Sequence, residues 1–429
     1  MKKLRKISMK TNMKAKMFTL PIPSFVLLFL TLFAASAIAH GPARGPASDP
    51  TSDAKSESTP DRHIQFPDTS EYRTLAVDLH THSVFSDGHV WPKIRVEEAL
   101  RDGLDALAIT EHLEYQPHRA DLIHPDRNRS FEIAKDAAEN QPLIVIAGSE
   151  ITREAPAGHI NAVFINDANK LLNVKTPQPA DTDAREYYLE AGKWPAQDAV
   201  DAAASQGAFL FWNHPYWTAQ QPDGIARIND FHANNAKNNK LHGIEIANGQ
   251  DYSEEAHQIA MDHNLAFIGV SDIHDLIDWD YPPSEGQHRP VTLVFASDAS
   301  AESIRDALFA KRTVVWFRNL LIGREAELLP LIDASIDITS AKYRTDNQLL
   351  DLTIQNNSDA YFLLRNRSNL TFMHGADLVR LKPNSATSLV VKPGTILDEI
   401  SLSFIVENAL TAPKANPTIE LTAKIAAGE

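Results

Sequence analysis

The segment from Asp78 to Gly88 holds the residues whose types and spacing most clearly suggest chemistry. It runs Asp78-Leu79-His80-Thr81-His82, and Ser86-Asp87-Gly88 follows. Side chains two residues apart on a strand share a face, so His80 and His82 point to the same side if a strand ends here. Neutral imidazole binds Zn, Fe and Mn alike, and Gly88 permits a turn that folds Asp87 back. A single His-x-His pair is weak evidence, so the rest of the chain decides whether it is a metal site.

Short apolar runs alternate with helical patterns from about Thr74 to Leu331. The expected strands are Leu75–Leu79, Ala106–Thr110, Leu143–Ala147, Asn161–Ile165, Ala208–Trp212, Gly243–Ala247, Phe267–Ser271 and Val291–Phe295. Strands that are nearly all apolar, separated by amphipathic helices, indicate a mostly parallel sheet covered by helices. The expected fold class is therefore α/β, as a closed or distorted barrel.

Residues that commonly bind metals stand at or just beyond the ends of these strands. They are His80 and His82, Glu111 and His112, Glu150 with His159 before the next strand, His214, and the pair Asp272 and His274. The carboxyl ends of parallel strands meet at one rim of an α/β fold. An isolated histidine there is usually structural and an aspartate is usually a helix N-cap. Together with Asp87, however, so many such groups on one rim predict a metal site.

Five motifs in this order resemble the PHP (polymerase and histidinol phosphatase) superfamily of metal-dependent phosphoesterases. They are Asp78-Leu-His80-Thr-His82 with Ser86-Asp87-Gly88, Ile109-Thr-Glu111-His112, Gly148-Ser-Glu150 with Gly158-His159-Ile-Asn161, Asn213-His214-Pro215, and Ser271-Asp272-Ile-His274. The resemblance implies a distorted (β/α)7 TIM-like barrel over residues 71–330. It also implies three divalent metal ions, which could be Zn, Mn or Fe.

The resemblance assigns a ligand set to each ion. The first ion takes His80, His82, Glu150 and Asp272; the second takes Glu150 as a bridge with His159 and His214; the third takes Asp87, His112 and His274. Two positions depart from the common pattern. Glu111 stands where an aspartate is common, and Asp87 stands where some members have histidine. The second departure bears on which metal occupies the third position.

The favoured function is an exported hydrolase of small phosphate mono- or diesters. A hydroxide shared by two metals would attack phosphorus, with Asp272 orienting it or accepting its proton and His274 assisting the leaving group. Arg153 and Asn213 are the expected substrate contacts. Two alternatives stay open: a metallohydrolase acting on a non-phosphate ester or amide, and a non-catalytic binding protein.

The N-terminus has the pattern of a signal peptide over residues 1–39. Seven basic residues precede the apolar stretch Ile22–Ala35, and Ala37-Ile-Ala39 fits a cleavage site. An uncleaved anchor is the alternative, although the apolar stretch is short for a membrane span. Residues 40–70 are rich in Pro, Ser, Ala and Gly and predict a flexible linker. The mature protein is thus expected in the periplasm or outside the cell.

Charge and cysteine content exclude several functions. The whole chain carries −15, so removal of the seven basic residues with the signal leaves −22. Such an acidic chain is unsuited to nucleic-acid binding. The chain has no cysteine, which excludes disulfides and thiolate chemistry. Residues 331–429 contain short strand patterns separated by turn residues, which predict a small all-β, sandwich-like domain.

Overall fold

The computed structural model describes residues 63–122, 125–174, 178–179, 181–345, 347–374 and 377–426. The predicted signal peptide and most of the predicted linker lie outside these residues, so both stay predictions. Within the described ranges, no helix combines the length and apolar character that crossing a membrane requires.

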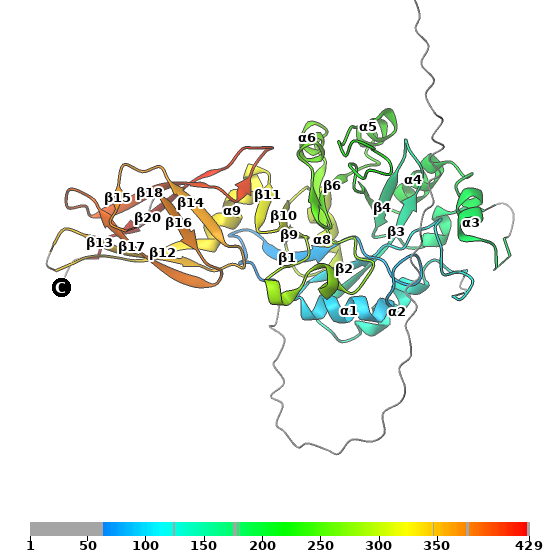
Figure 1. The fold of residues 1–429 in the computed structure, drawn as a ribbon, viewed down its shortest axis with the longest axis horizontal. Coiled ribbons are helices and arrows are strands. Elements are labelled where there is room, and N and C mark those ends of the chain that lie inside the picture. Colours follow the sequence, from blue (N-terminus) through cyan, green and yellow to red (C-terminus); the bar gives the residue numbers. More distant parts are fainter. Residues whose placement is uncertain are drawn as a thin grey trace, which may run out of the picture. The chain divides into compact units, whose positions relative to one another are not determined.

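The first part of the described chain is an α/β domain built on one large curled sheet (Figure 1). Its strands are β1 (Arg73–Asp78), β2 (Ala106–Ile109), β3 (Ile144–Thr152), β4 (His159–Val163), β5 (Phe209–Trp212), β6 (Gly243–Asn248), β7 (Asp251–Tyr252), β8 (Ala266–Val270), β9 (Val291–Ala296), β10 (Thr313–Phe317) and β11 (Leu320–Gly323). Its helices are α1 (Pro92–Arg101), α2 (Arg129–Ala137), α3 (Ala184–Ala191), α4 (Ala196–Ser205), α5 (Asp230–Lys237), α6 (Glu254–Asp262), α7 (Ile277–Asp280), α8 (Ala301–Phe309) and α9 (Glu325–Ser335).

The sheet is mixed, and the expectation of parallel strands holds for only part of it. The strand order is β19-β11-β10-β9-β1-β2-β3-β4-β5-β6-β7, with β8 paired to β6. Strand β19 (Ala409–Leu410) comes from the C-terminal part of the chain. Strands β1, β2 and β3 run parallel, as do β5, β6 and β8, whereas β4, β9, β10 and β11 pair antiparallel with their neighbours on the large sheet within this domain. Only a short turn joins β3 to β4, and a parallel crossover needs a dozen or more residues. That turn therefore imposes an antiparallel pair.

A side chain, not a backbone ladder, links β8 to β9. The Thr292 hydroxyl accepts a hydrogen bond from Gly269 N at 3.0 Å and donates one to Gly269 O at 2.9 Å. Gly269 also lets β8 pack closely against β10, because a Cβ at its position would collide with the Val315 side chain. The described pairings thus form a curled sheet, and the closed (β/α)7 barrel stays a prediction.

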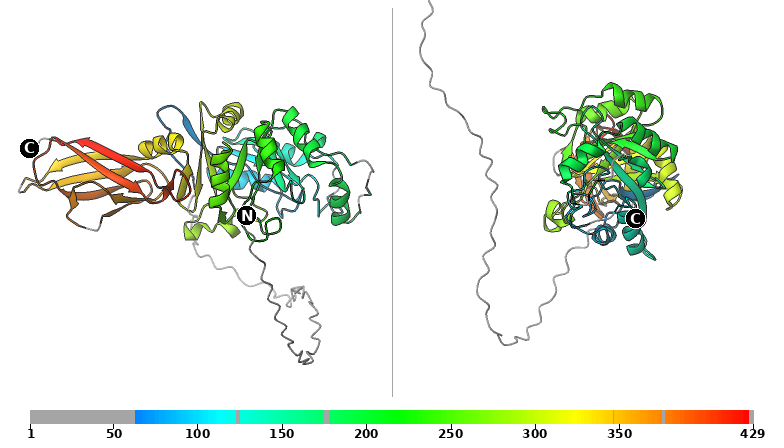
Figure 2. Two further views of the ribbon diagram at one scale, coloured as in Figure 1. Left: turned by 90° about the horizontal axis from the view of Figure 1, so that it is seen from above. Right: turned by 90° about the vertical axis from the view of Figure 1, so that its right-hand side faces the viewer.

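The helices follow from capping residues and apolar spacing. Helix α8 buries Ile304, Ala307 and Leu308, which recur at i, i+3 and i+4 and form one face. Its first turn is capped by Ser300, whose hydroxyl accepts a hydrogen bond from Ser303 N. Figure 2 shows the helices of this domain arranged around its strands.

The C-terminal part is all-β, as expected: eight of its strands form two four-stranded sheets, and β19 joins the large sheet beside β11 (Figures 1 and 2). One sheet has the order β12-β13-β17-β15 and the other β16-β14-β18-β20. The bounds are β12 (Ile336–Tyr343), β13 (Leu350–Asn356), β14 (Phe362–Asn366), β15 (Thr371–Phe372), β16 (Leu378–Leu381), β17 (Ser385–Lys392), β18 (Glu399–Val406), β19 (Ala409–Leu410) and β20 (Thr418–Lys424). Alternate residues of β13 are buried, the pattern of a strand with one face on a core. The first of these strands begins directly after α9, so the predicted boundary at residue 331 falls within that helix.

Candidate metal centre

The nine predicted ligands come from strand ends at one edge of the sheet. His80 and His82 follow β1, with Asp87 in the next loop; His112 follows β2; Glu150 lies in β3; His159 begins β4; His214 follows β5; Asp272 and His274 follow β8. Glu150 lies inside β3 because this strand extends past the predicted end at Ala147. His159 stands at the start of its strand, yet it reaches the same edge because β4 runs antiparallel to β3.

The four residues predicted for the first ion converge on one point. His80 Nε2 lies 2.9 Å from His82 Nε2, and Asp272 Oδ1 lies 3.1 and 3.2 Å from these two nitrogens. Glu150 Oε2 is 3.7 Å from His80 Nε2 and 3.5 Å from His82 Nε2. Two imidazoles and two carboxylates therefore point their ligand atoms at the same small volume.

The residues predicted for the second ion gather around the other oxygen of Glu150. Glu150 Oε1 lies 2.8 Å from His159 Nδ1 and 3.7 Å from His214 Nε2. His112 also approaches this carboxylate, with Nδ1 2.5 Å from Oε2. Glu150 thus faces two histidine groups with its two oxygens, as a bridging carboxylate would.

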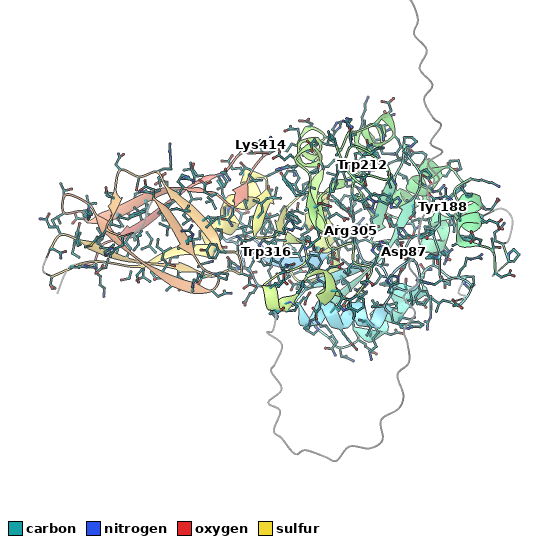
Figure 3. The ribbon with its side chains drawn as sticks, in the orientation of Figure 1. Asp87, Tyr188, Trp212, Arg305, Trp316 and Lys414 are labelled. Atoms are coloured by element: carbon teal, nitrogen blue, oxygen red, sulfur yellow. The ribbon has the colours of Figure 1, made fainter. Side chains whose placement is uncertain are left out.

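The residues predicted for the third ion surround Asp87. Its Oδ1 lies 3.1 Å from His274 Nε2 and 3.3 Å from His112 Nε2. His82 Nδ1 is somewhat farther away, at 3.8 Å. Asp87, which is labelled in Figure 3, therefore lies closer to His112 and His274 than to the histidine of its own motif.

Three sets of ligand atoms meet the spacing of a metal site, each set lying within 4.8 Å. They are His82, Asp87, His112 and His274; His80, His82 and Glu150; and His112, Glu150 and His159. Asp272 and His214 fall outside these sets. Asp272 contacts His80 and His82, and His214 contacts Glu150. The structure therefore brings all nine residues together. In the three sets, His112 lies beside Glu150 as well as beside Asp87.

Backbone bonds hold the ends of β1 and β8 against each other. Asp272 N donates to His80 O at 3.0 Å, and His82 N donates to Ile273 O at 3.1 Å. Asp272 has a φ of 51° and His214 a φ of 26°, which non-glycine residues seldom adopt. Such conformations cluster at functional sites because the surrounding structure holds them in place.

Glu245 of β6 supports the site, although the sequence analysis did not single it out. Its Oε1 lies 2.7 Å from His80 Nδ1, while Oε2 accepts hydrogen bonds from His214 N at 2.6 Å and Asn248 Nδ2 at 2.8 Å. A carboxylate behind an imidazole orients the ring and raises its basicity as a ligand. The available signal was a glutamate inside the otherwise apolar run Gly-Ile-Glu-Ile-Ala, since such strands rarely bury a charge without a partner.

Other polar side chains hold the remaining rings from behind. Ser86 Oγ lies 3.1 Å from His82 Nδ1 and donates to Glu111 Oε2 at 2.5 Å. Thr152 Oγ1 lies 2.7 Å from His112 Nδ1. The Ser86 contact leaves Nε2 of His82 to face the ligand cluster, whereas both nitrogens of His112 face it, Nδ1 toward Glu150 and Nε2 toward Asp87.

Asp78 supports the site without belonging to the cluster. It accepts hydrogen bonds from Ser271 N at 3.1 Å and Ser271 Oγ at 2.5 Å, and it pairs with the buried Arg289 at 3.1 Å. Arg289 also pairs with Asp102 at 2.9 Å. The first residue of the opening motif thus anchors the residue just before Asp272.

Asn213 and Arg153, the two expected substrate contacts, both bond to other parts of the chain, and their substrate roles stay predictions. Asn213 is buried, and its amide donates to Glu150 Oε1 at 2.9 Å while its oxygen accepts from Asn161 N. Arg153 donates to the buried Glu114 at 2.7 Å and to the Gly192 carbonyl at 3.0 Å. Asn213 therefore positions Glu150, and Arg153 serves an internal ion pair.

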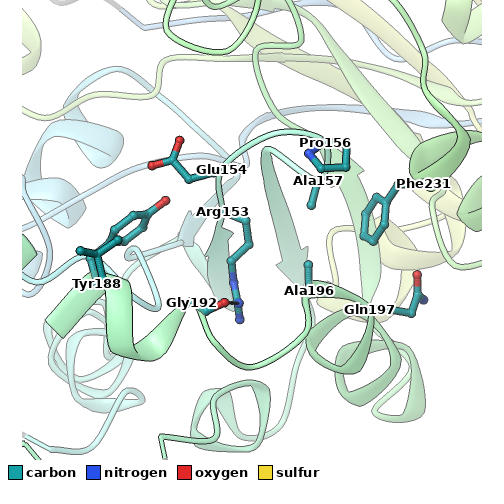
Figure 4. A pocket seen from close by; sticks show the side chains of 10 residues that line it. Arg153, Glu154, Pro156, Ala157, Tyr188, Gly192, Ala196, Gln197 and Phe231 are labelled. Atoms are coloured by element: carbon teal, nitrogen blue, oxygen red, sulfur yellow. Dashed lines mark hydrogen bonds between the residues drawn. The ribbon is translucent and has the colours of Figure 1, made fainter. Parts of the chain in front are cut away.

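Arg153 also lines a pocket that is separate from the ligand cluster (Figure 4). The pocket has a volume of about 390 Å³ and is bordered mainly by residues of the β3–β4 turn, α3 and α4. None of the nine predicted ligands lines it.

The electrostatics of the cluster suit cations. Burial by itself raises the pKa of Glu150, but the neighbouring histidines hold that pKa well below its usual range. Burial likewise opposes ionisation of Asp87 and Asp272, yet contacts with His112, His274 and His80 lower the pKa of both carboxyls. All three groups are therefore anions at neutral pH.

The histidines divide into two kinds. Burial lowers the pKa of His82 to about 3, and the nearby His274 and His112 act in the same direction. Burial also acts to lower the pKa of His80, but the carboxylates of Asp272, Glu245 and Glu150 raise it well above its ordinary value. His82 thus keeps a free lone pair on one ring nitrogen at neutral pH, whereas a metal entering the site would displace a proton from His80.

Several buried atoms of the cluster make no hydrogen bond of acceptable geometry, even where another ligand atom lies close. They are Asp87 Oδ1, Glu150 Oε2, His159 Nδ1 and His214 Nδ1. Buried polar atoms in native proteins are nearly always satisfied, so a group of such atoms calls for an explanation. Imidazole and carboxylate donors are suited to Zn, Mn and Fe. The residues present therefore fit divalent metal ions.

Comparison with known proteins agrees with this site. The PHP domain family model matches residues 78–207, and an Ig-like domain model matches residues 336–422. A crystal structure from Bacteroides vulgatus ATCC 8482, described as a two-domain protein containing a predicted PHP-like metal-dependent phosphoesterase, is 38% identical with a TM-score of 0.73. The match covers 84% of this chain and 98% of that one.

Two further structures share much less. A putative metal-dependent phosphoesterase from Bifidobacterium adolescentis ATCC 15703 is 18% identical with a TM-score of 0.34, and an amidohydrolase from Chromobacterium violaceum is 16% identical with a TM-score of 0.32. Each match covers 46% of this chain and 87% of the other, and neither carries weight here. No curated protein matches the chain.

The identity and coverage of the Bacteroides protein establish the family. The chain belongs to the PHP family of metal-dependent phosphoesterases. It is a two-domain member in which an Ig-like domain follows the PHP domain.

Proposed function

We propose that this protein is a hydrolase of small phosphate mono- or diesters with a site for three divalent metal ions. The observation that carries the proposal is the convergence of the nine residues. Seven of them form three groups joined by His82, His112 and Glu150, and Asp272 and His214 contact members of these groups. Bound divalent ions would supply Lewis-acid stabilisation of the phosphoryl oxygens and a water with a lowered pKa.

The residues of the chain have separate tasks in this proposal. One ion would be held by His80, His82, Glu150 and Asp272; the second would be held by Glu150, His159 and His214; the third would be held by Asp87, His112 and His274. Asp272 also orients the attacking water, and Asn248 Nδ2 fixes its other oxygen at 3.1 Å. His274 assists the leaving group, because its side chain is 33% exposed and is the most exposed of the nine candidate ligands.

The proposal includes export. The basic and apolar segments of residues 1–39 support a cleaved signal peptide and a periplasmic or extracellular location. N-terminal sequencing of the protein recovered from the cell envelope fraction tests this part. A mature N-terminus close to His40 would support export, and retention of residues 1–39 in the cytosol would contradict it.

Activity and metal content of the His82→Ala variant test the site. The mature protein, loaded with Zn, Mn or Fe, is assayed on p-nitrophenyl phosphate and bis-p-nitrophenyl phosphate, with metal analysis in parallel. We expect turnover of one or both, and a loss of bound metal with at least about a 100-fold loss of kcat in His82→Ala, since even loss of an outer partner costs 10- to 100-fold.

The matched control is His263→Ala, which removes an exposed histidine at the end of α6. This variant is expected to keep the metal content and turnover of the wild type. Persistent activity in His82→Ala would show that the ligand assignment is wrong. Hydrolysis of carboxyl esters or amides without phosphate esters would favour the alternative metallohydrolase.

A further inference from the structure

Trp217 lies directly against the candidate metal centre. Its ring centroid is 5.3 Å from that of His159 and 5.4 Å from that of His214. The backbone turns back at this point, because Trp217 N donates to His214 O at 2.9 Å. The turn brings the indole into contact with the two histidines assigned to the second ion.

The remaining surface of this indole is open to solvent. Trp217 is 45% exposed, whereas Trp212, five residues earlier, is 3% exposed and stacks on His232. Tryptophan is among the side chains that gain most from burial, so an exposed indole beside a reactive centre is a surface for contact with a ligand. A group bound beside His159 and His214 therefore has a partly exposed indole next to it.

The charged side chains named near the centre are carboxylates and a paired arginine, which are poorly suited to bind the alcohol portion of an ester. The cluster itself contributes the carboxylates Asp87, Glu150 and Asp272, and the nearby cation Arg153 is bound to Glu114. On the side of His159 and His214, the described residues therefore offer an exposed indole, while Arg153 is engaged by Glu114.

We propose that Trp217 is a specificity residue, and that the alcohol portion of the substrate contains a ring that stacks on its indole. This inference rests on the proposed phosphoesterase function and adds the class of ester to it. Hydrolysis takes up one water and releases phosphate and the ring-bearing alcohol. An aromatic ring and a pyranose both offer a flat face to an indole, so the experiment separates these two sources.

The test compares phenyl phosphate, glucose 1-phosphate and ethyl phosphate with wild type, Trp217→Ala and Trp217→Phe, all with verified metal content. We expect the ratio of kcat/KM for phenyl over ethyl phosphate to fall about tenfold in Trp217→Ala, mainly through KM, since loss of a stacking ring costs about this much. Trp217→Phe should retain the ratio within about threefold. A parallel fall for glucose 1-phosphate indicates a pyranose as well as an aromatic ring; a fall for phenyl phosphate alone indicates an aromatic ring.

The matched control is Trp279→Ala, which removes a 68% exposed tryptophan on α7. Its phenyl-to-ethyl ratio should equal that of the wild type. The inference is overturned if Trp217→Ala keeps the wild-type ratio, or if Trp279→Ala lowers it equally. An equal loss for all three substrates would also overturn it, because the indole would then merely support the histidines.

Binding of phosphonates distinguishes failure of this inference from failure of the proposed function. Metal-loaded wild type and Trp217→Ala are titrated with phenylphosphonate and ethylphosphonate by calorimetry. If no phosphate ester is hydrolysed, the proposed function fails. A preference for phenylphosphonate that disappears in Trp217→Ala still supports ring stacking, and the absence of any preference overturns it.

Discussion

At the scale of single residues, the candidate metal centre depends on side chains that hold its imidazoles from behind. Glu245 contacts His80 Nδ1 and also accepts a hydrogen bond from the His214 backbone, so one carboxylate orients residues of two ligand groups. Ser86 and Thr152 have comparable contacts with His82 and His112. Such partners orient the rings within the cluster.

The Glu245→Gln variant tests this support. An uncharged amide stabilises the His80 ring less well, so we expect the affinity for divalent metal to fall about 10- to 100-fold. Competition with a chelator measures the change in affinity. The control is Glu139→Gln, which alters an exposed residue after α2 and should bind metal like the wild type. Unchanged affinity in Glu245→Gln would contradict the supporting role.

A second prediction at this scale concerns His232, which lies outside the metal cluster. It is buried against Trp212 with ring centroids 3.9 Å apart, and burial lowers its pKa to about 3. The unfolded chain takes up a proton near pH 6.5, whereas the folded chain does so only near pH 3. The free energy of unfolding should therefore fall as the pH drops from about 6.5 to about 3.

Comparison of wild type with His232→Phe measures this contribution without metal. Phenylalanine can still stack on Trp212 but does not titrate. Between pH 6.5 and 5 the wild type should lose about 2 kcal/mol more stability than this variant. Denaturant unfolding in the presence of a chelator provides the values. His263→Phe, at an exposed position, should follow the wild type; equal pH dependence in all three proteins would refute the prediction.

At the scale of the elements, two features of the sheet build the site. The β3–β4 hairpin places Glu150 and His159 at one edge, since the start of an antiparallel strand lies beside the end of its neighbour. The contact between Thr292 and Gly269 holds β8 near β9, and the chain continues from β8 to Asp272 and His274. The position of these two residues thus depends on how closely β8 packs.

The Thr292→Val variant tests the second feature. It retains the shape of the side chain but removes both hydrogen bonds, which leaves the buried N–H and C=O of Gly269 without a partner. We expect a loss of about 2 kcal/mol in stability and weaker metal binding, because an unsatisfied buried group costs roughly 1–3 kcal/mol. The thermal midpoint and the metal affinity measure the two effects.

The control for this variant is Thr418→Val, on an exposed position of β20. It should change neither quantity. If Thr292→Val had the wild-type midpoint, the side-chain link between β8 and β9 would be unimportant for the sheet.

At the scale of the whole molecule, the Ig-like domain is joined to the large sheet. Strand β19 pairs with β11, and Asn408 donates hydrogen bonds to the carbonyls of Asn319 and Tyr361 at 2.9 and 2.8 Å. One continuous core cluster contains Trp316 and Leu331 from the first domain together with residues of the second. The two domains therefore stabilise each other.

A chain that ends at Ser335 tests this dependence. It lacks β19 and exposes the apolar residues of the shared core, so we expect a lower thermal midpoint and aggregation. Solubility and thermal unfolding of the truncated and full chains provide the comparison. The Asn408→Ala variant, which keeps the domain but loses the hydrogen bonds, should lie between the two. A truncated chain as stable and soluble as the full chain would show that the PHP domain does not need the second domain.

The α/β class, the all-β C-terminal part and the nine candidate ligands were predictable from local pattern. Apolar strands, turn residues and paired histidines are encoded by near neighbours in the chain, and ligand-type residues at successive strand ends are a recurrent signal. Strand direction was less accessible. The direction of β4 follows from the short turn after β3, and the extension of β3 past Ala147 depends on pairing with β4.

The segment Asp78–Asp87 shows which features of the site follow from the sequence and which depend on the tertiary structure. Its residue types determined that His80 and His82 face one side and are suited to metal. Only the tertiary structure decided that Asp78 pairs with Arg289, that Asp87 lies closer to His112 and His274, and that Glu245 stands behind His80. The physical reason is distance along the chain: a side chain's type sets what it can bind, but its partners, up to 211 positions away, meet it only when the sheet folds.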